Sequence, residues 1–287
     1  MTTTSVPRRR HVLGVLGDAV RQPQGALGAA MLALVALVSL GGPLVAPHGI
    51  EEVVGAPFAP PSGTALLGTD VLGRDVLSRL LHGGVALLSV AISATILAYL
   101  IGATWGMAVS LLGRWIDVAS IGLVDVLLSL PPLVIGLVLL AGAGSGNLTI
   151  AIALAAIQAP RVFRIVRAAS REVAAQDYVE AAFARGESRW TVLRRDVLAN
   201  IWTPMLTDFG LRITSSVILF SSLSFLGLGA PPPSPDWGQM ISENQIGLAA
   251  QPWGVIVPVV LIAVLSVGTN LLTDTVARLL HRGSEGV

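Results

Sequence analysis

The chain of 287 residues is marked first by what it lacks. It contains no cysteine, which excludes disulfide bonds and thiolate-ligated metal sites. It also contains no lysine, so all 18 residues counted as Lys or Arg are arginine. Because a nucleotide-binding P-loop needs a lysine to reach the phosphates, this chain cannot carry one. Charged residues make up only 12% of the chain, about half the share in an ordinary soluble domain.

Apolar residues make up 53% of the sequence. Several apolar runs reach the roughly 20 residues that a helix needs to cross a bilayer. The sequence therefore predicts an all-α membrane protein with six transmembrane helices. The predicted spans are about 26–46, 85–112, 116–142, 147–168, 203–228 and 253–278. Pro131 and Pro132 predict a kink in the third span.

The arginines predict how the chain is oriented and divided. With the N-terminus in the cytoplasm, fifteen arginines fall on the cytoplasmic side and only Arg74 and Arg79 on the outer side. Both termini are therefore predicted to be cytoplasmic. The predicted parts are a cytoplasmic segment 1–25, a first span 26–46, an outer loop 47–84 and a five-helix core 85–281. Within the outer loop, Asp75 and Arg79 are predicted to pair one turn apart on a short helix.

One polar segment, at about 161–202, interrupts the apolar core. Residues 161–200 hold 13 of the chain's 35 charges. Glu180, Ala181 and Ala182 favour a helix, Gly186 suits a left-handed helix end, and Ser188 can cap a second helix. The apolar face of that helix is expected to carry Trp190, Val192, Leu193 and Val197. Trp190 could alternatively anchor a contact with another protein.

Two interpretations of the polar segment follow from the residues. The small side chains of Ala181 and Ala182 would let a partner protein approach the backbone closely. The segment could equally be a solvated loop with helical propensity.

Four stretches carry a family resemblance. The EAA-x3-G pattern of Glu180–Gly186 resembles the EAA loop of ABC importer permeases. LGTDVLGRDVLSRLLHGG (67–84), SFLGLGAPPPSPDWGQMI (224–241) and NLLTDTVAR (270–278) are similar to segments of the C-type dipeptide and oligopeptide permeases. The four lie in order across most of the chain. Departures are Asp196 and Ala199 at the end of the loop, Val85, and Thr273 before Asp274.

The resemblance implies the permease of a type I importer in a bacterial plasma membrane. Its expected partners are a second, related permease, two ATPase subunits, an external solute-binding protein and the lipid bilayer, with no nucleic acid. ATP and magnesium would be bound by the ATPases, so this chain is expected to need no cofactor and to be no enzyme. The residues expected to couple to the ATPase are Glu180, Ala181, Ala182, Gly186, Ser188 and Arg189. The outer family motif comprises Gly68, Thr69, Asp70, Gly73, Arg74, Asp75, Pro232, Trp237 and Gly238.

The outer segments 67–75 and 230–238 are expected to form a cap. Its acids, Asp70, Asp75 and Asp236, could help to receive the binding protein, or the cap could only seal the outer gate. Trp237 is expected to pack either on the bilayer edge or on the first segment.

Alternatives remain for the transport class and the cargo. A secondary transporter would use intramembrane acids such as Asp125, Asp208 and Asp274. The spacing instead favours Asp208–Arg212 and Asp274–Arg278 ion pairs, and an interhelical hydrogen bond for Asp125. Peptides are the expected cargo, with metals bound to small carriers as the alternative.

Overall fold

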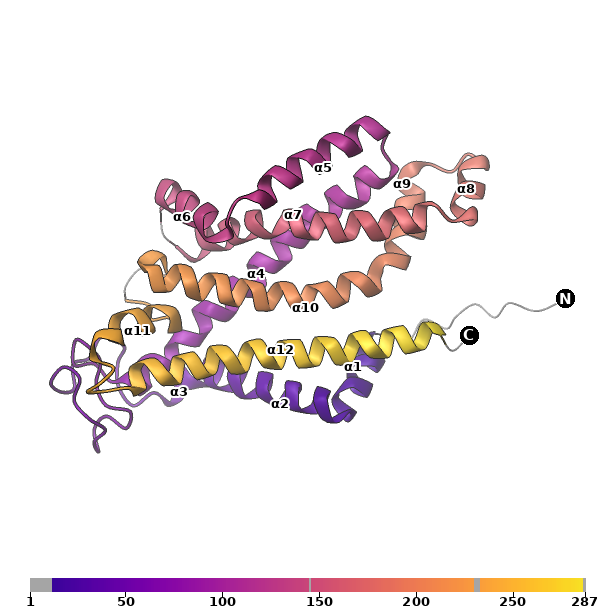
Figure 1. The fold of residues 1–287 in the computed structure, drawn as a ribbon. Coiled ribbons are helices and arrows are strands. Elements are labelled where there is room, and N and C mark those ends of the chain that lie inside the picture. Colours follow the sequence, from indigo (N-terminus) through magenta and orange to yellow (C-terminus); the bar gives the residue numbers. More distant parts are fainter. Residues whose placement is uncertain (1–11, 145, 230–232, 286–287) are drawn as a thin grey trace.

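The computed structural model describes residues 12–144, 146–229 and 233–285. This part of the chain is a helical bundle (Figure 1). Its α-helices are α1 (Val12–Arg21), α2 (Pro23–Ala36), α3 (Gly42–Val45), α4 (Val76–Leu111), α5 (Arg114–Ser129), α6 (Pro132–Ala143), α7 (Asn147–Ala174), α8 (Asp177–Ala184), α9 (Arg189–Val192), α10 (Leu198–Leu223), α11 (Trp237–Asn244) and α12 (Trp253–Glu285). Short π-helical turns continue three of these helices, at Leu37–Gly41, Leu193–Val197 and Ser224–Leu228.

The helices agree with the predicted all-α membrane fold. Five described helical segments are long and apolar enough to cross a membrane, or six if α5 and α6 together count as one span. These two helices meet at an angle of 88°. The break falls at Pro131 and Pro132, which confirms the predicted kink, because proline cannot continue the hydrogen-bond ladder of a helix.

The start of α4 corrects the predicted outer loop. The helix already begins at Val76, so residues 76–84 are its first turns. Asp75 is the N-cap, and its carboxylate accepts hydrogen bonds from the backbone N–H groups of Leu77 and Ser78. Asp75 therefore caps the start of the helix. The Asp75–Arg79 pair that the i,i+4 spacing predicted does not form, so that prediction is wrong. The helix α1 also lies within the segment 1–25, for which no helix was predicted.

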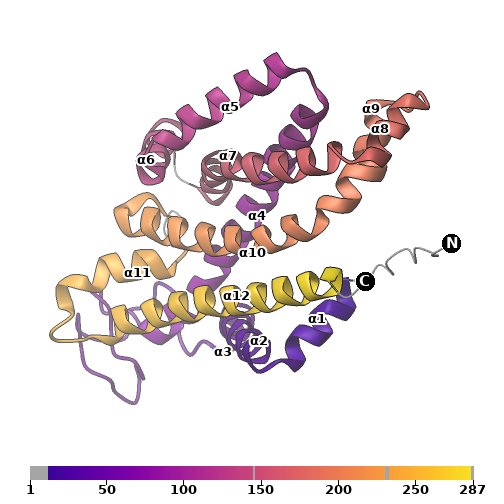
Figure 2. The same cartoon turned by 45° about the vertical axis from the view of Figure 1, so that its right-hand side comes forward.

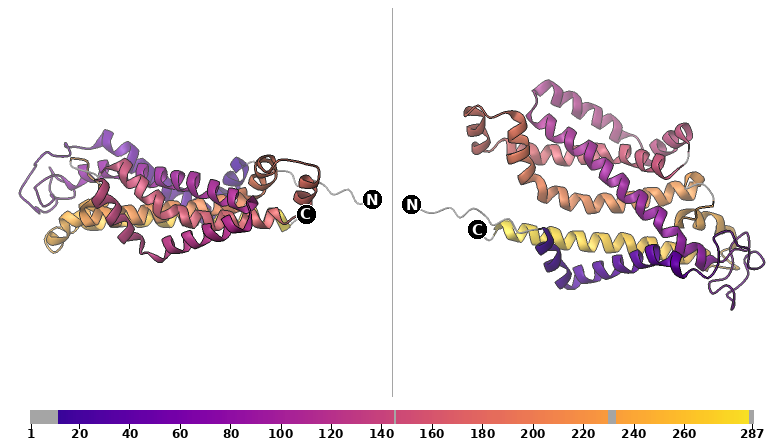
Figure 3. Two further views of the ribbon diagram at one scale, coloured as in Figure 1. Left: turned by 90° about the horizontal axis from the view of Figure 1, so that it is seen from above. Right: turned by 180° about the vertical axis from the view of Figure 1, so that it is seen from behind.

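The core forms where α4 crosses behind α7 and α10 (Figures 1 and 2). Leu87 of α4, Leu154 of α7 and Phe220 of α10 are fully buried together there. A side chain at Gly102 would lie 2.5 Å from the backbone oxygen of Ala159, so glycine allows α4 to approach α7 closely. On the other side of the bundle α2 runs alongside α12, and the whole molecule is flat when seen from above (Figure 3).

The two ends of the bundle differ. One end carries α8 and α9 together with α1 and the end of α12, and we call it the polar end (Figure 1). The other, the capped end, carries residues 46–75, α3 and α11. The arginine bias predicts that the polar end faces the cytoplasm, and this orientation stays a prediction.

Candidate functional site

The polar segment folds as two short helices joined by a tight turn. Glu180, Ala181 and Ala182 lie on α8, and Gly186 follows it with φ of +82°. The hydroxyl of Ser188 accepts a hydrogen bond from the backbone N–H of Thr191 at 3.2 Å and so caps α9. The predicted helix, left-handed glycine and serine cap are therefore confirmed.

Burial divides the two alanines. Ala182 is buried with Val179 in a cluster that also contains Val192 and Val197. Glu180 and Ala181 are exposed. The expectation that a partner could approach both alanines is therefore wrong for Ala182, whose small side chain lets α8 pack on the bundle.

Trp190 also differs from the prediction. Its ring is 59% exposed, whereas Val192, Leu193 and Val197 are buried. The guanidinium of Arg194 lies 4.8 Å from the ring centroid, a cation–π contact on the outside of α9. Trp190 therefore does not belong to the buried apolar face, and it joins Tyr178 and Phe183 as large exposed side chains on this end.

Charge on the polar end is only partly paired. Glu187 contacts Arg185 at 2.8 Å and Arg195 at 2.6 Å. The hydrogen bond from Arg185 and the charge of Arg195 lower the pKa of Glu187. Asp196, a departure from the family pattern, pairs with Arg195 at 3.1 Å. Among the described residues Arg189 and Arg194 have no acidic partner within 4.0 Å.

At the capped end, the outer family motif builds an ion network. The carboxylate of Asp70 contacts Arg74 at 2.7 Å and Arg79 at 2.5 Å. Glu243 of α11 contacts the same two arginines at 3.2 and 2.6 Å. Gly68 and Gly73 shape the loop with positive φ, and the hydroxyl of Thr69 donates to the backbone oxygen of Ala56 at 2.6 Å.

The second outer segment packs on the start of α4 and on the end of the α10 span. Trp237 is fully buried and donates its ring N–H to the backbone oxygen of Leu80 at 2.9 Å. Trp237 was expected on the bilayer edge or on the segment 67–75, and it lies instead on the first turns of α4, against Leu80, Gly83 and Gly84. Asp236 caps α11 and accepts a hydrogen bond from Ser224 at 2.5 Å. Gly238 leaves no room for a side chain, which would lie 2.5 Å from the backbone oxygen of Ser221, and Pro232 lies outside the described residues.

Burial changes the expected role of the three outer acids. Asp70, Asp75 and Asp236 are all inaccessible to solvent, so they cannot present charge to a binding protein. Each instead has partners inside the cap. The cap is thus a packed structure, and any docking surface on it must consist of other residues.

Sequence reasoning missed the partners on the far side of the cap. Glu243 bonds the two arginines, Asn244 accepts from the backbone N–H of Val71 at 3.1 Å, and Gln251 donates to Leu67 at 2.5 Å. These contacts span more than 160 residues of chain, and no local pattern signals them.

The intramembrane acids are mostly paired. Asp208 contacts Arg212 at 3.1 Å and accepts from the hydroxyl of Tyr99 at 2.7 Å, which confirms the predicted i,i+4 pair. Asp125 of α5 accepts from Arg164 of α7, which confirms the predicted interhelical hydrogen bond. Asp274 is exposed, and Arg278 contacts Gln24 and Thr275 instead, so the predicted Asp274–Arg278 pair is wrong.

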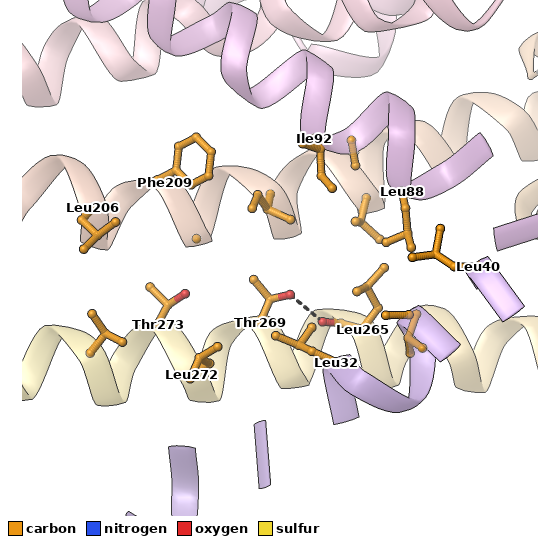
Figure 4. A pocket seen from close by; sticks show the side chains of 17 residues that line it. Leu32, Leu40, Leu88, Ile92, Leu206, Phe209, Leu265, Thr269, Leu272 and Thr273 are labelled. Carbon is orange, nitrogen blue, oxygen red and sulfur yellow. Dashed lines mark hydrogen bonds between the residues drawn. The ribbon is translucent and has the colours of Figure 1, made fainter. Parts of the chain in front are cut away.

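Two spaces lie among the spans. A cavity of about 430 Å³ separates α4 and α10 from α2 and α12, and its lining is almost entirely apolar (Figure 4). The hydroxyl of Thr269 in this cavity bonds Leu265 of its own helix. A hollow of about 380 Å³ lies on the outside of α10, beside Leu133 of α6 and Ile262 of α12. The buried hydroxyl of Ser221 in the hollow has no hydrogen-bond partner.

No cluster of three or more His, Asp or Glu side chains suited to a metal occurs in the part of the chain that the structure describes. The candidate site consists of a surface at the polar end, a packed cap at the other end, and the helices between them.

Comparisons with known proteins point to one family. Residues 98–284 match the family described as the binding-protein-dependent transport system inner membrane component. The chain is 34% identical over 214 residues to the glutathione transport system permease protein GsiD of Pectobacterium atrosepticum, covering 75% of this chain and 71% of the relative. It is 30% identical over 265 residues to the probable D,D-dipeptide transport system permease protein DdpC of Escherichia coli, covering 92% and 89%.

A solved structure shares the fold. A chain of the inward-facing MetNI methionine ABC transporter superposes with a TM-score of 0.57 at 16% identity. The match covers 70% of this chain and 96% of the other.

Proposed function

The chain belongs to the family of binding-protein-dependent transport system inner membrane components, and from that premise we propose how it works. It is a multi-pass permease subunit of an ABC importer in a bacterial inner membrane. The proposal is that the surface formed by α8, the turn at Gly186 and α9 docks on a separate ATPase. The same proposal holds that the assembly contains a second, related permease, two ATPase subunits and an external binding protein.

One observation carries the docking proposal. The polar end exposes Tyr178, Phe183 and Trp190, together with Arg189 and Arg194, which have no acidic partner within 4.0 Å among the described residues. Aromatic side chains and arginine are the residues enriched in protein interfaces. Because α8 contacts the membrane-spanning helix α7, and its Val179 and Ala182 belong to one buried cluster with Val166 of that helix, a push on this surface would be transmitted to the spans.

Cross-linking tests the docking surface. With no native cysteine in the chain, Ala181→Cys places a single thiol on the exposed face of α8. A short bifunctional maleimide should join it to the ATPase in the assembled importer. Ser62→Cys, at the exposed capped end, is the matched control and should give no such product. Equal yields from both positions, or none from Ala181→Cys, would refute the docking role.

We propose peptides as the cargo. Support comes from the relatives, which are named as glutathione and dipeptide transport permeases. The alternative is a solute such as a metal bound to a small carrier. Mass spectrometry of the ligand that co-purifies with the binding protein decides between them, since a peptide and a chelated metal differ in mass and metal content.

The energy source has its own test. Secondary transport would need an intramembrane acid free to exchange protons, whereas Asp208 is held by Arg212 and Tyr99. Uptake by the assembled importer should therefore be inhibited by vanadate and unaffected by an uncoupler. The reverse pattern would replace ATP-driven import with ion-coupled transport.

A further inference from the structure

A polar cluster lies inside the bundle where α4, α7 and α10 meet. Gln158 of α7 is fully buried, and its amide N–H groups donate to Ser216 at 2.5 Å and to the backbone oxygen of Arg212 at 3.1 Å. Thr95 of α4 contacts the same Ser216 at 3.0 Å. The amide oxygen of Gln158, however, has no hydrogen-bond partner. The cluster therefore does not satisfy all of its own polar groups.

Arg161 adds an unbalanced charge to this cluster. It lies one turn beyond Gln158 on α7, and Gln158 itself bonds the backbone oxygen of Arg212. Arg212 is paired with Asp208, but among the described residues Arg161 has no acidic partner within 4.0 Å. The neighbouring arginines of α7 differ from it, because Arg164 pairs with Asp125 and Arg167 with Asp117.

Both arginines fall inside predicted membrane spans, Arg161 in 147–168 and Arg212 in 203–228. At 1.5 Å per residue, Arg161 is about 21 Å from the start of α7 and Arg212 about 24 Å from the capped end of its span, within a hydrocarbon core of about 30 Å. An unpaired charge at such depth is costly and is usually found beside a water-filled route or a ligand.

The cluster reaches an exposed face of the bundle. Arg161 is half-buried, whereas Arg164 and Ala168 on the same side of α7 are exposed. On the neighbouring α10, Leu211 and Ile218 are exposed, and the hollow beside Ser221 lies farther along the same helix. If the cargo moves along this face, it passes Arg161.

We propose that Arg161, one turn from the buried cluster of Gln158, binds the carboxylate of an anionic cargo during its passage through the membrane. The guanidinium presents a planar pair of donors that matches a carboxylate. The free C-terminus of a peptide supplies such a group, so this inference rests on the proposed peptide transport and specifies which part of the peptide the permease recognises.

The test compares two probes in the complete importer, reconstituted in liposomes with its ATPases, partner permease and binding protein. Uptake of dialanine and of dialanine amide is measured for the wild type and for Arg161→Gln. For each probe, uptake by the variant is divided by uptake by the wild type. This ratio cancels any preference of the binding protein for one probe. Loss of a charge-assisted hydrogen bond should lower dialanine uptake about tenfold, while uptake of the amide should change far less.

Two further variants separate recognition from structure. Arg161→Lys keeps the charge but loses the planar pair of donors, so it should restore dialanine uptake only in part. Arg164→Gln removes a neighbouring arginine that already has a partner, and it should affect both probes equally.

Each outcome has a distinct meaning. An equal loss of uptake for both probes in Arg161→Gln would overturn the inference. If the partner permease also no longer co-purifies with that variant, Arg161 instead pairs with an acid of the partner permease. Dependence on anionic lipid, equal for both probes, would assign the arginine to a lipid headgroup. If the wild type takes up neither probe, the proposal of peptide transport is itself wrong. If the wild type takes up the probes and Arg161→Gln keeps the same ratio of dialanine to dialanine amide uptake, only the carboxylate site is wrong.

Discussion

Gly186 sets the angle between α8 and α9. Its φ is +82°, and a side chain there would meet nothing within 4 Å, so any substitution acts through the backbone alone. A β-branched residue resists this conformation, at a cost of about 1–2 kcal/mol. Gly186→Val should therefore displace the two helices and reduce both co-purification of the ATPase and cargo uptake, with normal insertion into the membrane.

Asparagine is the matched control at this position, because it enters the left-handed region more readily than other residues. Gly186→Asn should retain most of the uptake. Full uptake and ATPase binding in Gly186→Val would show that the turn does not position the docking surface.

Asp70 is the residue on which the outer cap depends most. Arg79 is only 3% exposed and would be left as a buried charge with the partly exposed Glu243 if Asp70 were neutralised. Asp70→Asn should therefore lower the stability of the permease by about 3–5 kcal/mol. Glu243→Gln should cost less, because Glu243 is 25% exposed and Asp70 still balances Arg79. Thermal unfolding in detergent measures both, and equal losses would contradict this ranking.

The same carboxylate predicts a pH effect. Burial alone would raise the pKa of Asp70, but the backbone N–H of Arg74 and the charge of Arg79 outweigh it, so the pKa is lowered from 3.8. The ionised carboxylate thus stabilises the fold above pH 3.8, and that contribution is lost as the pH falls through the lowered pKa. The difference in unfolding temperature between the wild type and Asp70→Asn should therefore narrow at acid pH.

Asp236 provides the opposite case. Burial raises its pKa from 3.8, although the hydrogen bond from Ser224 opposes the shift. Its contribution to stability is therefore largest at low pH and is lost as the pH rises through the raised pKa. The difference in unfolding temperature between the wild type and Asp236→Asn should therefore widen at acid pH. If this difference changes in the same direction with pH for Asp70→Asn and Asp236→Asn, the environments assigned to the two acids are wrong.

Helices differ in how far the sequence alone predicted them. The turn at Gly186, the cap at Ser188 and the Asp208–Arg212 pair were predictable because each depends on neighbours within a few residues. The exposure of Trp190 was not, because it depends on which side of α9 faces the bundle. The partner of Arg79 was not predictable either. Asp75 is nearer in sequence, but its carboxylate caps the start of α4, and Arg79 pairs with Asp70 instead.

The contact between α2 and α12 depends on a close backbone approach. A side chain at Gly28 would lie 2.8 Å from the backbone oxygen of Gly268, so a larger residue must push the helices apart. Gly28→Leu should therefore detach the first span and lower the yield of intact permease. Gly41→Leu lies in the same span but meets nothing within 4 Å, and it should be tolerated. Size-exclusion profiles and limited proteolysis compare the two, and equal tolerance would show that the contact is dispensable.

The whole molecule divides into a polar end and a capped end, and this division was largely predictable from composition. Charge predicts that the polar segment beyond the span 147–168 lies outside the bilayer, and the alternation of apolar runs predicts the cap on the opposite side. The 88° break between α5 and α6 was predicted only as a kink, because the prolines fix where a helix ends but not the direction in which the chain continues. Packing of α6 on α7 supplies that direction.

Orientation in the membrane is the prediction that belongs to the complete molecule. Ser62 and Ser234 are exposed at or beside the capped end, and Ser188 is exposed at the polar end. In intact cells an impermeant thiol reagent should label Ser62→Cys and Ser234→Cys but not Ser188→Cys, because the arginine-rich end is retained in the cytoplasm. Ala181→Cys, which leaves the cap of α9 intact, should match Ser188→Cys, and both should react once the cells are lysed. Labelling of the polar-end thiols before lysis would reverse the orientation and would place the proposed ATPase surface on the wrong side of the membrane.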